Sequence, residues 1–195
     1  MNFLIADAEI EKAIPNKNDS PIPGIKYCQG WNDHANMGIS VMGAYEHQLK
    51  RYRVFMEDNK EEFISACEQA DVVVTFNGIG FDAKLVKAVW GYDIPEVKHY
   101  DILREVRIAL DLDPVTGDYV KGLSLDAITQ KNLGICKTGN GALAPIDWQQ
   151  GRIGKVIDYC LNDILMTLKL FERIINIGEL VCPNTGKILK MRIPE

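Results

Sequence analysis

The sequence predicts an α/β fold in which a mixed β-sheet carries helices on both faces. Two short apolar segments, residues 3–8 (FLIADA) and 71–76 (DVVVTF), have the composition of buried strands, and the second is rich in β-branched residues. A long segment, residues 152–177, repeats apolar residues at intervals of four and three, which is typical of an amphipathic helix. The order of these patterns indicates one five-stranded sheet flanked by helices.

The N-terminal part of the chain is expected to supply three strands. Residues 3–8 form the first strand, and residues 10–37, rich in Pro, Asn, Asp and Gly, form a long loop. Loops of this length within a compact domain are usually functional or mobile. Residues 38–46 and 49–57 form two strands joined by a tight turn, and a helix follows over 59–70.

The middle of the chain alternates between strand and helix patterns. The strand at 71–76 ends at Asn77-Gly78, a dipeptide that is typical of turns. The elements expected after it are a helix from about 80 to 90, a strand over 96–100, helices near 101–112 and 123–133, and a glycine-rich loop over 134–147.

The C-terminal part is dominated by the helix at 152–177. Its apolar stripe consists of six residues: Ile157, Leu161, Ile164, Leu168, Phe171 and Ile175. Gly178 is placed to cap the C-terminus of this helix. Residues 179–195 are expected to form a hairpin extension that turns around Pro183–Gly186, as part of a single domain spanning residues 1–195.

Composition excludes several classes of protein. The 195 residues are 47% hydrophobic and 25% charged, and no apolar run approaches the roughly 18 residues that cross a membrane. The apolar run near the N-terminus is short and followed by acidic residues, unlike a signal peptide, so a cytoplasmic protein is expected. The five cysteines are widely spaced, which predicts free thiols rather than disulfides or a zinc ribbon. A net charge of −5 argues against a protein that coats duplex DNA, but is compatible with a nuclease that holds only a strand end.

Acidic residues follow two of the predicted strands. Asp7 and Glu9 lie at the end of the first strand, where side chains two residues apart point to the same face and could hold a hard cation. A solvated strand end is the simpler interpretation of this pair taken alone. Asp82 falls in the first turn of the helix after residues 71–76, where the helix dipole by itself favours a carboxylate.

A further acidic residue, Asp163, lies within the long helix. It forms a second stripe with Met166 and Leu170, and an inward-facing carboxylate is unfavourable unless it is paired or bound to a metal. An internal salt bridge or a position at the rim of the core would also satisfy it. Tyr159 precedes Asp163 by four residues, so the two side chains share one face of the helix.

Together, and in this order, these segments resemble the three motifs of the DEDD superfamily of 3′–5′ exonucleases, whose fold is RNase H-like. Asp7-Ala-Glu9 resembles the D-x-E motif, Asn77–Asp82 resembles the second motif with three residues before Phe-Asp, and Tyr159–Asp163 resembles the Y-x(3)-D motif. The tyrosine is typical of the DEDDy branch, and the spacing of the second motif is similar to that in the proofreading domains of family-B DNA polymerases.

The resemblance extends from Phe3 to about Ile175, and it is closest to stand-alone predicted exonucleases related to that polymerase domain. Two residues depart from the family pattern. Ile10 stands where a threonine often follows D-x-E, and Ala6 stands where a bulkier apolar residue often precedes it. Neither departure removes a metal ligand, and Ile10 changes the expected contacts to the terminal nucleotide.

The resemblance implies a metal-dependent 3′–5′ exonuclease acting on single-stranded nucleic acid, with DNA favoured over RNA. Two divalent cations, Mg²⁺ or Mn²⁺, separated by about 4 Å, would clamp the attacking and leaving oxygens of the phosphodiester. Asp7 is expected to bridge the ions, Glu9 and Asp163 to complete one site, and Asp82 to hold the other. Tyr159 would orient the attacking water, because an unperturbed pKa of about 10 makes it a poor general base.

Five residues are candidates for contact with nucleic acid. Asn77 and Phe81 belong to the second motif, although Phe81 also suits the core. Tyr27 and Trp31 could stack on bases or could pin the long loop to the core. Lys137 could contact backbone phosphates or lie on a solvated surface. The expected partners are a single-stranded 3′ end and a polymerase or another repair or replication protein, with no membrane.

Three other functions remain open at this point. An RNase H-fold module that binds nucleic acid without catalysis is disfavoured because the carboxylates of all three motifs are present. A glycosidase with paired carboxylates would leave Tyr159 and Asp163 unexplained. An exoribonuclease that trims RNA differs from the main hypothesis only in its substrate.

Overall fold

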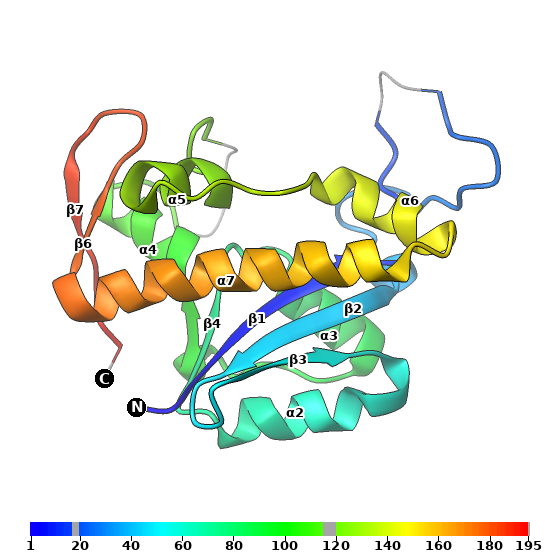
Figure 1. The fold of residues 1–195 in the computed structure, drawn as a ribbon, viewed down its shortest axis with the longest axis horizontal. Coiled ribbons are helices and arrows are strands. Elements are labelled where there is room, and N and C mark those ends of the chain that lie inside the picture. Colours follow the sequence, from blue (N-terminus) through cyan, green and yellow to red (C-terminus); the bar gives the residue numbers. More distant parts are fainter. Residues whose placement is uncertain (17–19, 115–119, 195) are drawn as a thin grey trace.

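The computed structural model describes residues 1–16, 20–114 and 120–194 and shows a sheet flanked by helices (Figure 1). The strands of the sheet are β1 (Phe3–Ile10), β2 (Ile39–Glu46), β3 (Arg51–Phe55), β4 (Val72–Thr75) and β5 (His99–Asp101). The helices are α1 (His34–Met37), α2 (Lys60–Gln69), α3 (Asp82–Trp90), α4 (Ile102–Ala109), α5 (Leu125–Leu133), α6 (Ala144–Gln149) and α7 (Ile153–Ile177). Two short strands, β6 (Glu179–Val181) and β7 (Ile188–Lys190), form a C-terminal hairpin.

The five strands lie in the order β3-β2-β1-β4-β5, and the sheet is mixed. The β1–β2 and β2–β3 pairs are antiparallel, whereas the β1–β4 and β4–β5 pairs are parallel. The predicted α/β fold with a five-stranded mixed sheet and a C-terminal hairpin is therefore confirmed. Among the residues that the structure describes, no helix is long and apolar enough to cross a bilayer.

Alternate residues of β1 contribute to two separate cores on opposite faces of the sheet. Phe3 and Ile5 belong to the core that includes α7, whereas Leu4 and Ala6 belong to the core that includes Phe63 of α2. In Figure 1, α7 crosses one face of the sheet and α2 lies on the other side. Odd-numbered residues of β1 therefore face α7.

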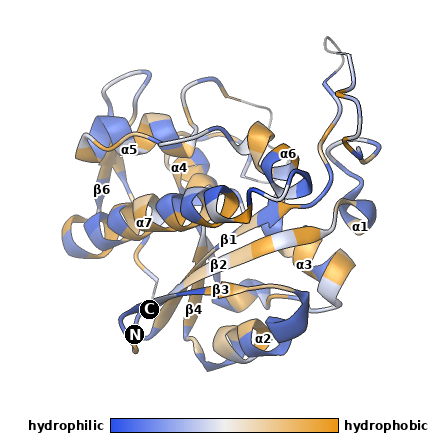
Figure 2. Cartoon of the chain, turned by 45° about the vertical axis from the view of Figure 1, so that its right-hand side comes forward, coloured by the Kyte–Doolittle hydropathy of each residue, from blue (hydrophilic) through white to orange (hydrophobic). Residues whose placement is uncertain are grey.

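The core face of α7 lies between the two stripes predicted for this helix. Ile164, Leu168 and Phe171 of the first stripe are buried, but its remaining members are only partly covered. Met166 and Leu170 of the second stripe are fully buried. Figure 2 shows that α7 carries both hydrophobic and hydrophilic residues along its length, as an amphipathic helix should.

Two short helices lie in segments that the sequence predicted as loops. α1 forms the last four residues of the predicted loop at 10–37, and α6 begins within the predicted glycine-rich loop at 134–147. Residues 17–19 of the first loop lie outside the described part of the chain. Both are too short to show helical periodicity, which needs a longer window. Pro145 lies in the first turn of α6, the helical position that tolerates proline.

His99 of β5 gives the fold a predictable dependence on pH. Its side chain is buried, and its Nε2 lies 2.8 Å from the hydroxyl of Thr75. Burial, together with the charge of Arg104, lowers the pKa of His99 to about 4, although the charge of Glu96 opposes this shift. Because the unfolded chain has the higher pKa, about 6.5, this group's stabilising contribution is present above about pH 6.5 and is lost as the pH falls towards 4.

His99→Gln is expected to remove this dependence while keeping a polar partner for Thr75. The free energy of unfolding of the wild type should rise relative to the variant by about 2–3 kcal/mol between about pH 4.5 and pH 7. Urea titrations of both proteins across this range measure the difference. A difference that does not change with pH would contradict the prediction.

Candidate active site

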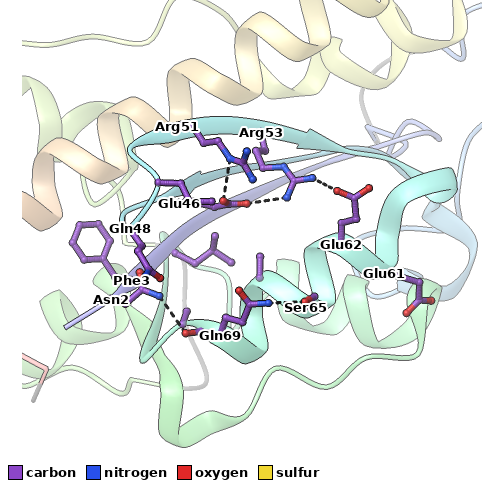
Figure 3. Close-up of a pocket in the computed structure, with 14 residues that line it drawn as sticks. Asn2, Phe3, Glu46, Gln48, Arg51, Arg53, Glu61, Glu62, Ser65 and Gln69 are labelled. Carbon is purple, nitrogen blue, oxygen red and sulfur yellow. Dashed lines mark hydrogen bonds and ion pairs between the residues drawn. The ribbon is translucent and has the colours of Figure 1, made fainter.

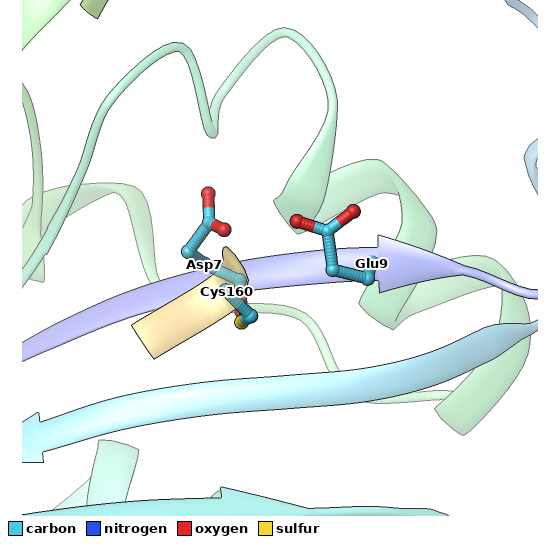
Figure 4. Close-up of side chains that lie close together, drawn as sticks. All are labelled: Asp7, Glu9 and Cys160. Carbon is cyan, nitrogen blue, oxygen red and sulfur yellow. The ribbon is translucent and has the colours of Figure 1, made fainter. Parts of the chain in front are cut away.

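Asp7 and Glu9 continue the odd-numbered series of β1 and face α7. In Figure 4 their side chains rise from the same side of the strand. A β-bulge follows between Glu9 and Ile10, where the register against β2 shifts. The residue left out of the pairing, Ser40, donates its hydroxyl to the carbonyl of Ile10 over 3.1 Å. The bulge ends regular pairing directly beyond the two carboxylates, as bulges near active sites often do.

Asp82 reaches the same end of β1 from the start of α3. Its Oδ1 accepts a hydrogen bond from the backbone N–H of Ala8 over 2.9 Å. This donor is free because the parallel pairing of β1 with β4 ends at Ile5 and Val74. Asp82 is buried although it is acidic, and its position in the first turn of α3 suits a negative charge.

Asp163 and Tyr159 approach from α7, and a lysine from the loop before α6 joins them. The Nζ of Lys137 forms an ion pair with Oδ2 of Asp163 and donates a hydrogen bond to the hydroxyl of Tyr159 over 2.8 Å. Gly139 and Gly141 pack against the ring of Tyr159, since a Cβ on Gly139 would lie 2.7 Å from its Cδ2. The Oδ1 of Asp163 is buried and has no hydrogen-bond partner among the described residues.

The charges of neighbouring carboxylates contribute to the raised pKa values of Asp7, Glu9 and Asp82. Burial, followed by the charges of Asp82, Glu9 and Asp163, raises the pKa of Asp7 well above its usual value. Burial and the charges of Asp163 and Asp82 raise the pKa of Glu9 in the same way. Burial raises the pKa of Asp82 to about 7 although the N–H of Ala8 opposes the shift. The cluster is therefore unfavourable when fully ionised, unless cations compensate it.

These residues fit a hard divalent cation. Asp7, Glu9 and Cys160 each place one ligand atom within 4.8 Å of the others. The thiol of Cys160, however, donates to the carbonyl of Asp7 over 3.4 Å, and burial raises its pKa well above the usual value, so it stays protonated. The unpartnered Oδ1 of Asp163 is an oxygen of the kind that Mg²⁺ and Mn²⁺ prefer, but among the described residues Asp163 does not belong to this group of close ligand atoms.

The predicted aromatic contacts with nucleic acid lie in two different settings. Trp31 is 69% exposed, and its ring meets Phe81 edge-on with centroids 6.0 Å apart. Phe81 directly precedes Asp82 in the chain and is partly buried against the core on the α2 side of the sheet. Tyr27 is instead occupied within its own loop, where its hydroxyl accepts the N–H of Ile22 over 3.0 Å.

Two acidic residues that the sequence did not single out hold backbone segments of the site. The Oδ1 of Asp126 accepts the N–H of Lys137 over 2.6 Å. Asp101 accepts hydrogen bonds from the turn that contains Asn77. Asn77 itself is exposed, with a backbone φ of 67° in the left-handed region. No spacing rule connects either acid to its partner segment, so the sequence carries no signal for these contacts.

A surface pocket of about 420 Å³ lies elsewhere and takes no part in the site. It includes Leu4, which faces away from α7, and it opens between α2 and the β2–β3 end of the sheet (Figure 3). Both arginines that line it are paired with acids, since Arg51 and Arg53 bind Glu46 and Arg53 also binds Glu62. Among the described residues, the pocket therefore offers no unpaired cation, whereas Glu61 forms no ion pair.

Comparisons with known proteins agree with the fold. Residues 28–175 match the profile of the RNase H superfamily, a stretch that contains Asp82, Tyr159 and Asp163 but begins after Asp7 and Glu9. The chain is also similar to a family B DNA polymerase from the hyperthermophilic archaeon Pyrobaculum calidifontis, with a TM-score of 0.62 and 16% identity. This likeness covers 95% of the chain but only 26% of the polymerase chain, and at such identity it concerns the fold alone. None of the curated proteins compared matches the sequence.

Proposed function

Because this chain belongs to the RNase H superfamily, we propose that its clustered carboxylates make it a metal-dependent 3′–5′ exonuclease. The observation that carries the proposal is that Asp7 and Glu9 lie close together, Asp82 accepts the N–H of Ala8 between them, and Asp163 lies one helical turn from Cys160, whose thiol contacts Asp7. A structural role is a poor account of this cluster, because burying mutually repelling carboxylates destabilises a fold.

Two divalent cations, Mg²⁺ or Mn²⁺, would bind this cluster. Asp7 is central and would contact both ions, Glu9 and Asp163 would complete one site, and Asp82 would serve the other. When bound, the ions would neutralise the carboxylates and stabilise the charge that develops on a phosphodiester during hydrolysis. The buried, unpartnered Oδ1 of Asp163 supports this assignment, since it is an acceptor that the protein leaves free.

Tyr159 would act as a hydrogen-bond donor that positions the attacking water. Burial and the charge of Asp163 raise its pKa above the usual value of about 10, so its hydroxyl keeps its proton at neutral pH. The ammonium of Lys137 contacts this hydroxyl and Asp163. Burial by itself lowers the pKa of Lys137, but the charge of Asp163 raises it above its usual value, so the side chain stays charged. Lys137 would therefore bring a positive charge to the reacting phosphate.

The substrate we propose is the 3′ end of a single strand, with DNA favoured over RNA. The exposed ring of Trp31 meets Phe81, the residue before Asp82, and would offer a stacking surface that tolerates any base. A net charge of −5 supports contact with a short strand end rather than with a long duplex. A polymerase or another repair or replication protein would be the partner that supplies such ends.

We expect Mg²⁺ or Mn²⁺ to support stepwise release of mononucleotides from a 3′-terminal strand, and we expect EDTA to abolish it. The test follows 5′-labelled single-stranded DNA and RNA of the same sequence, side by side, in each metal. Equal activity in EDTA would exclude the metal mechanism. Cleavage of a closed circular strand would indicate an endonuclease, and faster digestion of RNA would make the protein an exoribonuclease. Metal-dependent binding of strands without cleavage would identify a silent binding module.

A further inference from the structure

Asp101, at the end of β5, uses both carboxylate oxygens to hold backbone N–H groups from two separate elements. Its Oδ1 accepts from Leu103 over 2.9 Å and from Arg104 over 3.3 Å, which caps the N-terminus of α4. The same oxygen accepts from Asn77 over 2.8 Å, and Oδ2 accepts from Ile79 over 3.0 Å. One carboxylate, 3% exposed, thus joins the start of α4 to the turn after β4.

The turn held by Asp101 is joined directly to the residues that place Asp82. The carbonyl of Gly78 accepts the N–H of Ala83 over 2.8 Å, and the carbonyl of Asn77 accepts the N–H of Phe81 over 3.2 Å. Asn77 adopts a left-handed backbone conformation, which is uncommon for a residue other than glycine and needs support from its surroundings. A shift of this turn would therefore move the first turn of α3 and Asp82 with it.

Helix capping alone does not account for Asp101. The neighbouring helix α5 is capped by Ser124, whose exposed hydroxyl accepts the N–H of Ala127 over 3.2 Å. A neutral hydroxyl is thus enough for a cap, whereas Asp101 buries a charge, and burying a charge is unfavourable without several strong hydrogen bonds. Both additional hydrogen bonds of Asp101, from Asn77 and Ile79, come from the turn before Asp82.

We propose that Asp101 is a positioning residue that fixes the Asn77–Phe81 turn and, through it, holds Asp82 in place to bind the second divalent cation. This inference rests on the proposed function, because it assigns Asp101 to the metal site of that reaction. Asp101 itself would touch neither the ions nor the substrate. It would act on the carboxylate of Asp82 indirectly, by fixing the backbone turn that precedes it, as residues that support metal ligands commonly do.

Asp101→Asn separates the two roles of this side chain. Asparagine caps helices about as well as aspartate, so its side-chain oxygen can keep the hydrogen bonds to α4. Its amide nitrogen would then face the N–H of Ile79, and because both groups are donors this hydrogen bond is lost. We expect the variant to bind its first Mn²⁺ like the wild type and its second about 10- to 100-fold more weakly. Electron paramagnetic resonance, which counts free Mn²⁺ in a titration, measures both affinities without activity. Turnover should recover as Mn²⁺ is raised.

Ser124→Ala is the matched control, since it removes a helix cap and leaves the turn intact. It should lower thermal stability without weakening either ion. Gly78→Ala tests the turn with Asp101 unchanged, because a Cβ there would lie 2.3 Å from the hydroxyl oxygen of Thr75 and the turn must move. It should weaken the second ion as Asp101→Asn does, which keeps the inference testable if that variant does not fold.

The outcomes distinguish the two proposals. If the wild type binds fewer than two ions, the proposed two-metal function fails. If the wild type binds two ions and both Asp101→Asn and Gly78→Ala bind the second with wild-type affinity, Asp101 is only a helix cap and the inference is overturned.

Discussion

Asp7→Ala and Asp163→Ala are each expected to lower nuclease turnover by about a thousandfold or more, which is roughly 4 kcal/mol of activation free energy. In the proposed site, each change removes a carboxylate that no neighbour could replace, because the remaining acids would serve other ligand positions. Single-turnover digestion of a labelled strand at saturating Mg²⁺ measures the loss. Melting curves recorded on the same samples show whether the fold survives.

Stability should respond differently in the two variants. Burial and three neighbouring carboxylates raise the pKa of Asp7, so in metal-free buffer its ionised form opposes folding. Asp7→Ala should therefore melt at a higher temperature than the wild type in alkaline buffer, where Asp7 is ionised, and the gain should shrink as the pH falls towards the raised pKa and Asp7 takes up a proton. Asp163→Ala has no such gain, because it leaves the ammonium of Lys137 without its ion pair.

Asp158→Asn is the control for these variants, because Asp158 is an exposed acid on the same helix. It should leave turnover and melting temperature unchanged. Near-wild-type turnover in Asp7→Ala or Asp163→Ala would refute the assignment of metal ligands. Loss of activity accompanied by loss of the fold would require the isosteric Asp7→Asn and Asp163→Asn, which keep the side-chain volume and remove only the charge.

Tyr159→Phe is expected to lower turnover by about ten- to a thousandfold, since the loss of one oriented hydrogen bond in a transition state costs roughly 1.4–4 kcal/mol. The Michaelis constant should change little, because the ring keeps its packing against Gly139 and Gly141. Measuring kcat and KM separately over a range of pH distinguishes these effects. Tyr159→His should not restore full rate, because a histidine there places its nitrogen differently from the phenol oxygen.

The contact between Tyr159 and Lys137 allows a sharper version of this experiment. Lys137→Met and the double variant complete a cycle that separates the effect of the hydroxyl from that of the ammonium it contacts. Tyr52→Phe removes an exposed hydroxyl from β3 and should be silent. If Tyr159→Phe is as fast as the wild type at every pH, the hydroxyl has no catalytic role and Tyr159 is a packing residue.

The fold could be predicted from the sequence where local patterns were strong. The β-branched run at 71–76 and the periodic segment at 152–177 correspond to β4 and α7, and Gly178 ends α7 in the left-handed conformation as predicted. Boundaries were less accurate where the deciding contacts are not local. The helix predicted from about residue 80 begins at Asp82, because the residues before it form the turn that Asp101 holds.

In the sequence, the candidate site is indicated by its four acidic side chains and by Tyr159, which together resemble the three motifs of one exonuclease superfamily. Asp7 and Glu9 followed from alternation along a strand, and Asp163 from its inward position on a helix. Lys137 was predicted to contact backbone phosphates or to lie on a solvated surface, and nothing in the sequence indicated that its ammonium contacts Asp163 and Tyr159. That arrangement depends on how the loop before α6 folds back over α7, and no periodicity describes such a loop.

The path of α7 has a consequence for how the protein folds. Asp7 and Asp163 are separated by 156 positions along the chain (163 − 7), and α7 also covers the apolar face of β1 that carries Phe3 and Ile5. Contacts over such a separation form late, because closing the intervening chain is entropically unfavourable. Docking of α7 therefore completes the core and the acidic cluster in a single step. A partly folded chain in which α7 is undocked would expose the apolar face of β1 and would lack Asp163 in its acidic cluster, so the proposed nuclease activity would begin only with the complete fold.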